Sequence, residues 1–249
     1  LYVIAQDQNY NPNLRVVDVI SPTSPTEVGA SAIFQSLSPT SMAISGTYAY
    51  ALGYTLRVVD ISDPIRPTQL VTIPVSGQDI AIVGRYAYVA SLYGGHLRIL
   101  DIISPTAPVE VGLYQGNQYA SAKMVAVSGN YAYLLDCSSC YDYSLAWWLR
   151  VLDISDPRRP TLLSSYSQSS GISDLAAVGT RLYVAAGSKG LLVLDVTNPS
   201  QIREVVSLPS WTANGVAVAG NPSVPSAPSE APSVPSAGQA FAYVAADWK

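Results

Sequence analysis

The sequence predicts an all-β fold, a β-propeller of four-stranded blades, and three observations support this prediction. A unit of about 42 residues recurs along the 249-residue chain, and each complete unit holds four short strand-like stretches. One of these stretches is apolar at both alternating positions, as a sheet that is packed on both faces requires. Another carries an alanine three residues before a glycine in every unit, which suits an innermost strand on a narrow axis. We expect one domain over residues 1–249.

The repeat is clearest in the stretch Leu-Arg-Val-Val-Asp, which we call the Arg/Asp-strand. Its acids are separated by 42, 41, 52 and 42 residues and are Asp18, Asp60, Asp101, Asp153 and Asp195. Four residues after each comes a proline, preceded by Ser, Asp or Asn, and such side chains bond to the local backbone and initiate turns. A calcium site gathers about six or more oxygens, usually from closely spaced acids in one loop. We therefore predict that the repeated acids cap turns rather than bind calcium.

Two strands precede the Arg/Asp-strand in each unit, and a short outer strand follows the proline turn. The first is the Ala-strand, with Ala43, Ala81, Ala126, Ala176 and Ala217, which we expect around one axis. The second is the Tyr-strand, seen as Tyr48-Ala49-Tyr50 and its counterparts. Six Tyr-strands occur, including Leu1-Tyr2-Val3, but only five of the other two, so the first and last repeats are incomplete.

These counts predict about six blade positions. Residues beyond the ends, the C-terminal strands or a partner could complete the ring, and we favour a six-position ring with an irregular junction between the termini. An open propeller leaves unpaired strand edges, which invite pairing with other chains. A right-handed β-solenoid is the alternative fold, but its coils are usually shorter.

The motif Tyr-Ala-Tyr-Val-Ala, followed by Leu-Arg-Val-Val-Asp-Ile-Ser-Asp-Pro, resembles the LVIVD-repeat propellers of bacteria and archaea. The resemblance covers nearly the whole chain except its inserts. It implies a secreted or surface-exposed propeller, commonly one module of a larger protein, so we expect an extracellular or cell-surface location. It carries no catalytic signature that could be transferred to particular residues.

Composition excludes some classes of function. Hydrophobic residues make up 49% of the chain and charged residues 12%, about half the usual charged share. With a net charge of −4 and no basic stripe, nucleic acid is not an expected partner. The longest apolar stretches have the length of a strand, so we expect no membrane-spanning segment. Both ends cut through the repeat, and we expect the chain to be part of a longer product.

An insert over residues 136–148 contains both cysteines, Cys137 and Cys140. A Cys-x-x-Cys pair can be a redox couple, half of a zinc site or a haem attachment. Haem attachment needs a histidine next, zinc needs four ligands although His96 is the only histidine, and a redox couple expects a helix N-terminus. We therefore predict a disulfide that pins a long loop in an oxidising compartment. No metal or cofactor is expected.

A second insert, residues 221–240, is rich in Pro and Ser and predicts an extended spacer without helix or strand. It is either a flexible solvent loop or a glycosylated arm that reaches a partner. Ser with Pro suits O-glycosylation in secreted proteins, and the candidate acceptors are Ser223, Ser226, Ser229, Ser233 and Ser236.

The loops on one face of the propeller are rich in aromatic residues, which are typical of protein or glycan recognition. The candidate binding residues are Tyr93, His96, Tyr141, Tyr143, Trp147, Trp148 and Trp211. These rings could instead pack down to cover the blade ends. Because Trp147 and Trp148 are adjacent, we expect one ring to pack on the blade and the other to face outward.

No nucleophile elbow, histidine pair or phosphate-binding glycine loop occurs, so we expect a non-enzymatic protein. The first hypothesis is an interaction module that binds protein or glycan through the aromatic face. The alternative is a structural subunit of a larger extracellular assembly, a filament or envelope complex, in which self-assembly buries the open edges. An enzyme with a site in the axial funnel is a distant alternative.

Overall fold

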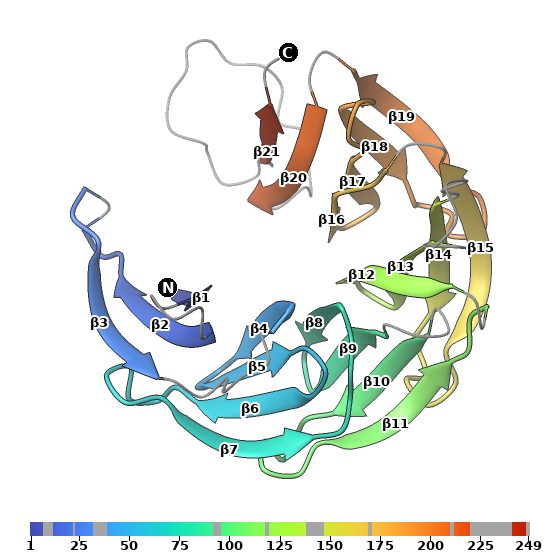
Figure 1. The fold of residues 1–249 in the computed structure, drawn as a ribbon. Helices are drawn as coiled ribbons and strands as arrows, with labels where there is room; N and C mark the ends of the chain where they lie inside the picture. Colours follow the sequence, from blue (N-terminus) through green and yellow to red (C-terminus); the bar gives the residue numbers. More distant parts are fainter. Residues whose placement is uncertain are drawn as a thin grey trace. The chain divides into compact units, whose positions relative to one another are not determined.

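The computed structural model describes residues 1–6, 12–21, 23–31, 39–91, 96–117, 120–137, 147–168, 171–209, 212–219 and 241–247. These residues form the strands β1 to β21, arranged in antiparallel sheets (Figure 1). They include no helix of the length and apolar character that a bilayer crossing demands. The chain divides into two compact units, Leu1–Gln118 and Tyr119–Lys249, which are described separately. A single domain over the whole chain stays a prediction.

The first unit holds three sheets. The first sheet has three strands, β1 (Tyr2–Gln6), β2 (Pro12–Asp18) and β3 (Thr26–Ser31). The second has four, β4 (Ser41–Ser45), β5 (Tyr48–Leu52), β6 (Leu56–Asp60) and β7 (Thr68–Ile73). The third has β8 (Asp79–Val83), β9 (Tyr86–Ala90), β10 (Leu97–Asp101) and β11 (Val109–Tyr114).

The second unit also holds three sheets. The fourth sheet has β12 (Ser121–Ser128), β13 (Tyr131–Cys137), β14 (Trp147–Asp153) and β15 (Thr161–Gln168). The fifth has β16 (Asp174–Val178), β17 (Arg181–Ala185), β18 (Leu191–Asp195) and β19 (Arg203–Leu208). The last has two described strands, β20 (Thr212–Ala219) and β21 (Phe241–Asp247).

Each four-stranded sheet follows the predicted order of Ala-strand, Tyr-strand, Arg/Asp-strand and outer strand (Figure 1). The all-β propeller assignment, with four-stranded antiparallel blades, is therefore confirmed. The first sheet begins at its Tyr-strand, and the described part of the last ends at its Tyr-strand, which agrees with incomplete first and last repeats. Ala-strands of neighbouring sheets contact each other within a unit, β4 with β8, and β16 with both β12 and β20. A ring of alanines that spans both units stays a prediction.

The turn from Ala-strand to Tyr-strand explains the repeated glycine. Gly46, Gly84, Gly129 and Gly179 have φ between 57° and 60°, in the left-handed region where a side chain is disfavoured. The tight reversal sets the register that places each Ala-strand alanine opposite the third residue of the Tyr-strand, as Ala43 lies opposite Tyr50.

A β-bulge between the Arg/Asp-strand and the outer strand is a feature that the sequence did not predict. The register shifts at the same point in all five such pairings, between Val58 and Val59 in the second sheet. Bulges increase local twist. In the first sheet the outer strand carries Gly29 there, and an added Cβ would lie 2.2 Å from the carbonyl oxygen of Pro64 in the next sheet's turn.

Within each unit the core lies between neighbouring sheets, and the second sheet is packed on both faces. In β6 the adjacent residues Val58 and Val59 point to opposite faces, and both are fully buried. One joins a cluster with the third sheet, and the other joins a cluster with the first. Fully burying a valine contributes about 1.5–3 kcal/mol, so the second sheet is stabilised by its two neighbours rather than alone.

Candidate binding site at the end of the fourth sheet

The fourth sheet is longer than the other four-stranded sheets, with strands of 7 or 8 residues where the others have 5 or 6. The extra length lies at the end where β13 leads toward β14. There Cys137 pairs with Trp147, and Asp136 pairs with Trp148. The predicted loop insert is wrong at these four residues, because they belong to the strands β13 and β14. The intervening residues 138–146 lie outside the described part.

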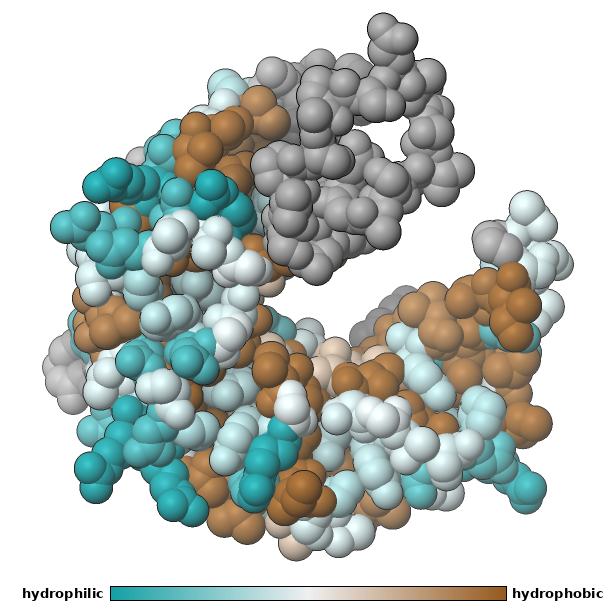
Figure 2. All heavy atoms as spheres, turned by 180° about the vertical axis from the view of Figure 1, so that it is seen from behind, coloured by the Kyte–Doolittle hydropathy of each residue, from teal (hydrophilic) through white to brown (hydrophobic). Residues whose placement is uncertain are grey.

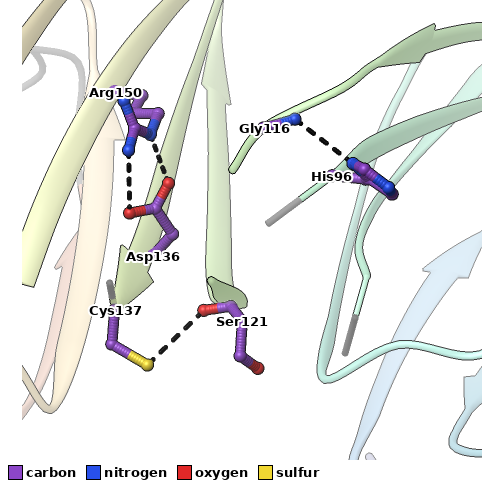
Figure 3. A network of polar contacts seen from close by, with 6 residues as sticks. All are labelled: His96, Gly116, Ser121, Asp136, Cys137 and Arg150. Carbon is purple, nitrogen blue, oxygen red and sulfur yellow. Dashed lines mark hydrogen bonds and ion pairs between the residues drawn. The ribbon is translucent and has the colours of Figure 1, made fainter. Parts of the chain in front are cut away.

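A buried ion pair joins these two strands (Figure 3). Arg150 Nε donates a hydrogen bond to Asp136 Oδ2, and Arg150 Nη2 donates one of 3.3 Å to Asp136 Oδ1. The Asp136 side chain is fully buried, and the Arg150 side chain is 16% exposed. Burial raises the pKa of the Asp136 carboxyl above its ordinary value, and the contact with Arg150 opposes this rise. Arg150 thus compensates the charge of a carboxylate that has no access to water.

The repeat explains why Arg150 turns to Asp136. In the first and third sheets the same arginine pairs with an acid twelve residues later on the outer strand, Arg15 with Glu27 and Arg98 with Glu110. In the fourth sheet that position is Leu162. No acid stands at this position of the outer strand, and the Arg150 guanidinium bonds to Asp136 on β13 instead.

The two adjacent tryptophans lie on opposite faces of β14. Trp147 packs against the core cluster shared by the fourth and fifth sheets. Its Nε1 is buried and has no hydrogen-bond partner among the described residues. The guanidinium carbon of Arg150 lies 5.8 Å from the ring centroid of Trp148, within the range of a cation–π contact. We predicted that one ring faces outward, but both residues are half-buried.

The start of β12 lies at the same end of the sheet, beside the end of β13. Ser121 pairs with Cys137, and its carbonyl oxygen lies 3.7 Å from Cys137 Sγ (Figure 3). The Ser121 hydroxyl is buried without a hydrogen-bond partner in the described part of the chain. Cys140 lies outside the described residues, so the disulfide with Cys137 stays a prediction. A mass measurement with and without reductant would test it.

Comparison with known proteins decides the family. The description "LVIVD repeat" matches residues 2–32, 39–72, 76–116, 120–138, 145–168 and 172–208. The chain belongs to the LVIVD repeat family. The matched segments cover six repeats, and the gap at 139–144 falls within the long insert. A search of curated proteins finds no match.

Solved structures share the fold of this LVIVD repeat chain at low sequence identity. A protein from Lactobacillus plantarum superposes with a TM-score of 0.67 and 15% identity, over 88% of this chain and 71% of that one. A putative 6-phosphogluconolactonase from Bacteroides fragilis gives 0.65 and 12%, over 89% and 71%. A functionally unknown protein from Desulfotomaculum acetoxidans gives 0.64 and 15%, over 83% of this chain. The chain spans 65% of the length of that last protein.

The repeated acids of the LVIVD repeat cap turns, as predicted. Each accepts a backbone N–H from two residues later, at 2.8 Å for Asp18, Asp60, Asp153 and Asp195 and at 3.0 Å for Asp101. Hydrogen bonds from the side chain and then the backbone N–H of the residue two positions later lower the pKa of Asp60, Asp153 and Asp195. Across the described ranges, no group of three or more His, Cys, Asp or Glu side chains is placed to hold a metal ion.

His96 lies in the first unit, directly before β10, and is partly buried. Its Nδ1 accepts a hydrogen bond of 3.2 Å from the backbone N–H of Gly116 (Figure 3), so the ring proton of the neutral form is on Nε2. Burial, and then the charge of Arg98, lower the pKa of His96, which favours the neutral form at pH 7. The imidazole is therefore fixed by the fold.

The other predicted site residues are divided between described and undescribed parts of the chain. The undescribed ones are Tyr93, Tyr141, Tyr143, Trp211, Cys140 and the candidate glycosylation sites Ser223, Ser226, Ser229, Ser233 and Ser236. Of the residues that the structure describes, Trp147 and Trp148 lie together with Asp136 and Arg150. That ion pair was not predicted from the sequence, although Leu162 in place of an outer-strand acid was a signal that Arg150 has another partner.

Proposed function

We propose that this LVIVD repeat chain is a non-enzymatic interaction module outside the cell or on its surface. It binds protein or glycan through the end of the fourth sheet, where Trp147 and Trp148 begin β14. The observation that carries the proposal is the buried Asp136–Arg150 pair at that end of the sheet.

The buried Asp136–Arg150 pair is not required to form a sheet of this repeat, because the first and third sheets form without one. Removing a charge from water costs several kcal/mol even after relaxation, and the attraction within the pair often only compensates for this. The first and third sheets avoid this cost, since their arginines pair with partly exposed acids. The fourth sheet instead fixes β13 to β14 where the loop leaves the sheet. Such a rigid strand end suits a site whose side chains must be held in place for recognition.

The aromatic side chains supply the contact surface. Tryptophan offers a large, rigid and amphipathic area at a small cost in conformational entropy, and it is enriched among the residues that dominate binding energy. The Trp148 ring keeps part of its surface exposed while Arg150 lies over it. Trp147 carries a buried N–H that has no partner in the described part of the chain. Because Trp147 packs against the core cluster and Trp148 keeps exposed surface, we choose Trp148 as the central contact residue.

The extracellular or cell-surface location is supported by the resemblance to secreted propellers, and a disulfide at Cys137 would suit an oxidising compartment. The enzyme hypothesis draws on proteins such as the putative 6-phosphogluconolactonase from Bacteroides fragilis, and 12% identity there supports the fold alone. A structural subunit of a larger assembly is the second candidate function. The observation that favours it is the exposed apolar surface of the first sheet, where Ile20 is 91% exposed.

The experiment is a binding comparison between two variants. Wild type, Trp148→Ala and Ile103→Ala are applied to an array of neutral and acidic oligosaccharides. A photo-crosslinking side chain placed at residue 148 or 103 tests for a protein partner in extracts of the cell envelope. Ile103 is a matched control, because it is 70% exposed at the opposite end of a sheet.

We expect binding or crosslinking that depends on residue 148, with at least about a tenfold loss in Trp148→Ala, which corresponds to about 1.4 kcal/mol. The melting temperature of Trp148→Ala should stay close to that of wild type. Equal loss in both variants, or crosslinks from residue 103 alone, would contradict the proposed site.

A further inference from the structure

A small polar cavity lies in the first unit, where segments of the second and third sheets meet. It has a volume of about 70 Å³ and is lined by Thr40, Gly53, Tyr54, Gly77 and Gln78. Thr40 directly precedes β4, Gly53 and Tyr54 connect β5 to β6, and the other two residues lead into β8. None of the five is charged. The cavity belongs to other sheets than the binding site proposed above.

Hydrogen bonds fix the backbone around this cavity. The N–H of Gly77 donates to the carbonyl oxygen of Gly53 at 2.9 Å, which joins the two sheets. The Thr40 hydroxyl donates to the carbonyl oxygens of Gly77 at 3.0 Å and of Leu52 at 3.2 Å. Because the hydroxyl proton is turned to these carbonyls, the Thr40 oxygen can still accept a hydrogen bond from elsewhere. The cavity is therefore preformed by the fold.

The third sheet departs from the fifth at this position. In the fifth sheet the residue two positions before the Ala-strand is Ile172, which is 5% exposed and packs in a core cluster. In the third sheet that residue is Gly77. An added Cβ at Gly77 would lie 2.6 Å from Val89 Cγ1 and 2.7 Å from the Ala90 carbonyl oxygen. The glycine thus brings the chain close to β9 and contributes no side chain that could fill the cavity.

Two side chains at the cavity have no role in holding the fold together. Tyr54 is 64% exposed, and Gln78 is half-buried. Neither the Tyr54 hydroxyl nor the Gln78 side-chain amide has a hydrogen-bond partner among the described residues. An amide side chain offers two donors and one acceptor. An aromatic ring beside a few convergent polar groups is typical of a small-molecule site.

We propose that this cavity binds one neutral monosaccharide unit, at the end or on a branch of a glycan. The Tyr54 ring would lie against the C–H face of the sugar ring. The Gln78 amide and the Thr40 oxygen would bond to its hydroxyl groups. The sugar is neutral because no lining residue carries a charge that could pair with an acidic sugar.

The size of the cavity limits the ligand. Its volume of about 70 Å³ is well below the about 300–1,000 Å³ of sites for drug-sized ligands. The cavity therefore contacts one sugar unit only, and a free monosaccharide should bind with about millimolar affinity.

The test follows backbone and side-chain amide signals by NMR while methyl glycosides of glucose, galactose and N-acetylglucosamine are added. We expect at least one of these sugars to shift the amide signals of Gly53, Gly77 and Gln78 and to saturate them. Tyr54→Ala should weaken this binding at least about tenfold. Gln78→Leu keeps the size of the side chain but removes its amide, and it should weaken the binding too.

The matched control is Ile65→Ala. Hydrophobic side chains reach the surface in several places (Figure 2, brown), and Ile65, in the turn at the opposite end of the second sheet, is 63% exposed. This variant should bind the sugar as wild type does. No saturable shift with any of the three glycosides, or an unchanged affinity in Tyr54→Ala, would overturn the proposal. Equal shifts with glycerol would overturn it as well, because the site would then not recognise a sugar ring.

Discussion

Arg150 holds the fully buried carboxylate of Asp136 from the neighbouring strand, with Nη2 3.3 Å from Oδ1 and Nε bonded to Oδ2. The two side chains lie at the end of β13 and near the start of β14, where residues 138–146 leave the sheet. Their contact joins β13 to β14 at this end of the sheet.

Replacing Asp136 by Asn should destabilise the protein by about 3–5 kcal/mol, since it leaves the charge of Arg150 without its buried partner. The control is Glu110→Gln, which breaks the partly exposed pair with Arg98 and should cost about 0–1 kcal/mol. Denaturant unfolding with equal slopes for the three proteins measures both differences. Similar costs for the two variants would mean that the Asp136 pair contributes no more than a surface pair.

The two tryptophans should differ in their effect on stability. Trp147 packs against the core cluster, so Trp147→Ala should cost about 2 kcal/mol or more, whereas Trp148→Ala should cost less than about 1 kcal/mol. Thermal unfolding of the two single variants measures this order. If Trp148→Ala is the more destabilising variant, Trp148 is a structural residue rather than a contact residue.

The aspartates that cap the turns should make the stability of the protein depend on pH. The pKa of Asp153 in the folded chain lies below its ordinary value because the Ser155 side chain and backbone donate hydrogen bonds to the carboxylate. The folded state therefore binds this proton less readily than the unfolded state. The resulting stabilisation is present above about pH 3.8 and is lost as the pH falls through the lowered pKa.

Asp153→Asn keeps an oxygen that accepts the Ser155 N–H but removes the titration. Its melting temperature should fall less steeply between about pH 5 and about pH 2 than that of wild type. Asp153→Ala removes the turn bond too and should be less stable already at neutral pH. An unchanged pH dependence in Asp153→Asn would show that the turn bond does not lower this pKa.

Two glycines should be sensitive to substitution for different reasons. Gly84→Ala forces a left-handed φ of 60° on a residue with a side chain, at about 1–2 kcal/mol, but the new Cβ meets no described atom within 4 Å. Gly29→Ala places its Cβ 2.2 Å from the Pro64 carbonyl oxygen, so the outer strand and the next turn must move apart. Unfolding midpoints should rank Gly29→Ala below Gly84→Ala, and the reverse order would contradict this packing.

The sequence predicted strand order, turn glycines and turn acids because each of these is determined within one repeat. Asp18 and its counterparts cap turns through residues two positions away, and such short-range contacts recur wherever the motif recurs. The contacts that depart from the repeat were harder to predict. Arg150 bonds to Asp136 in the sheet where Leu162 stands at the position of Glu27 and Glu110, and the strands β13 and β14 extend into the predicted loop insert.

The most direct test of the proposed function is amide hydrogen exchange of the chain with and without the glycan or crosslinked partner that the binding comparison identifies. We expect slowed exchange at the end of β13 and the start of β14, at Asp136 and from Trp147 to Arg150. Exchange at the Asp turns, around Ile103, should stay unchanged. Protection confined to those turns, with none at Trp147 and Trp148, would contradict the account.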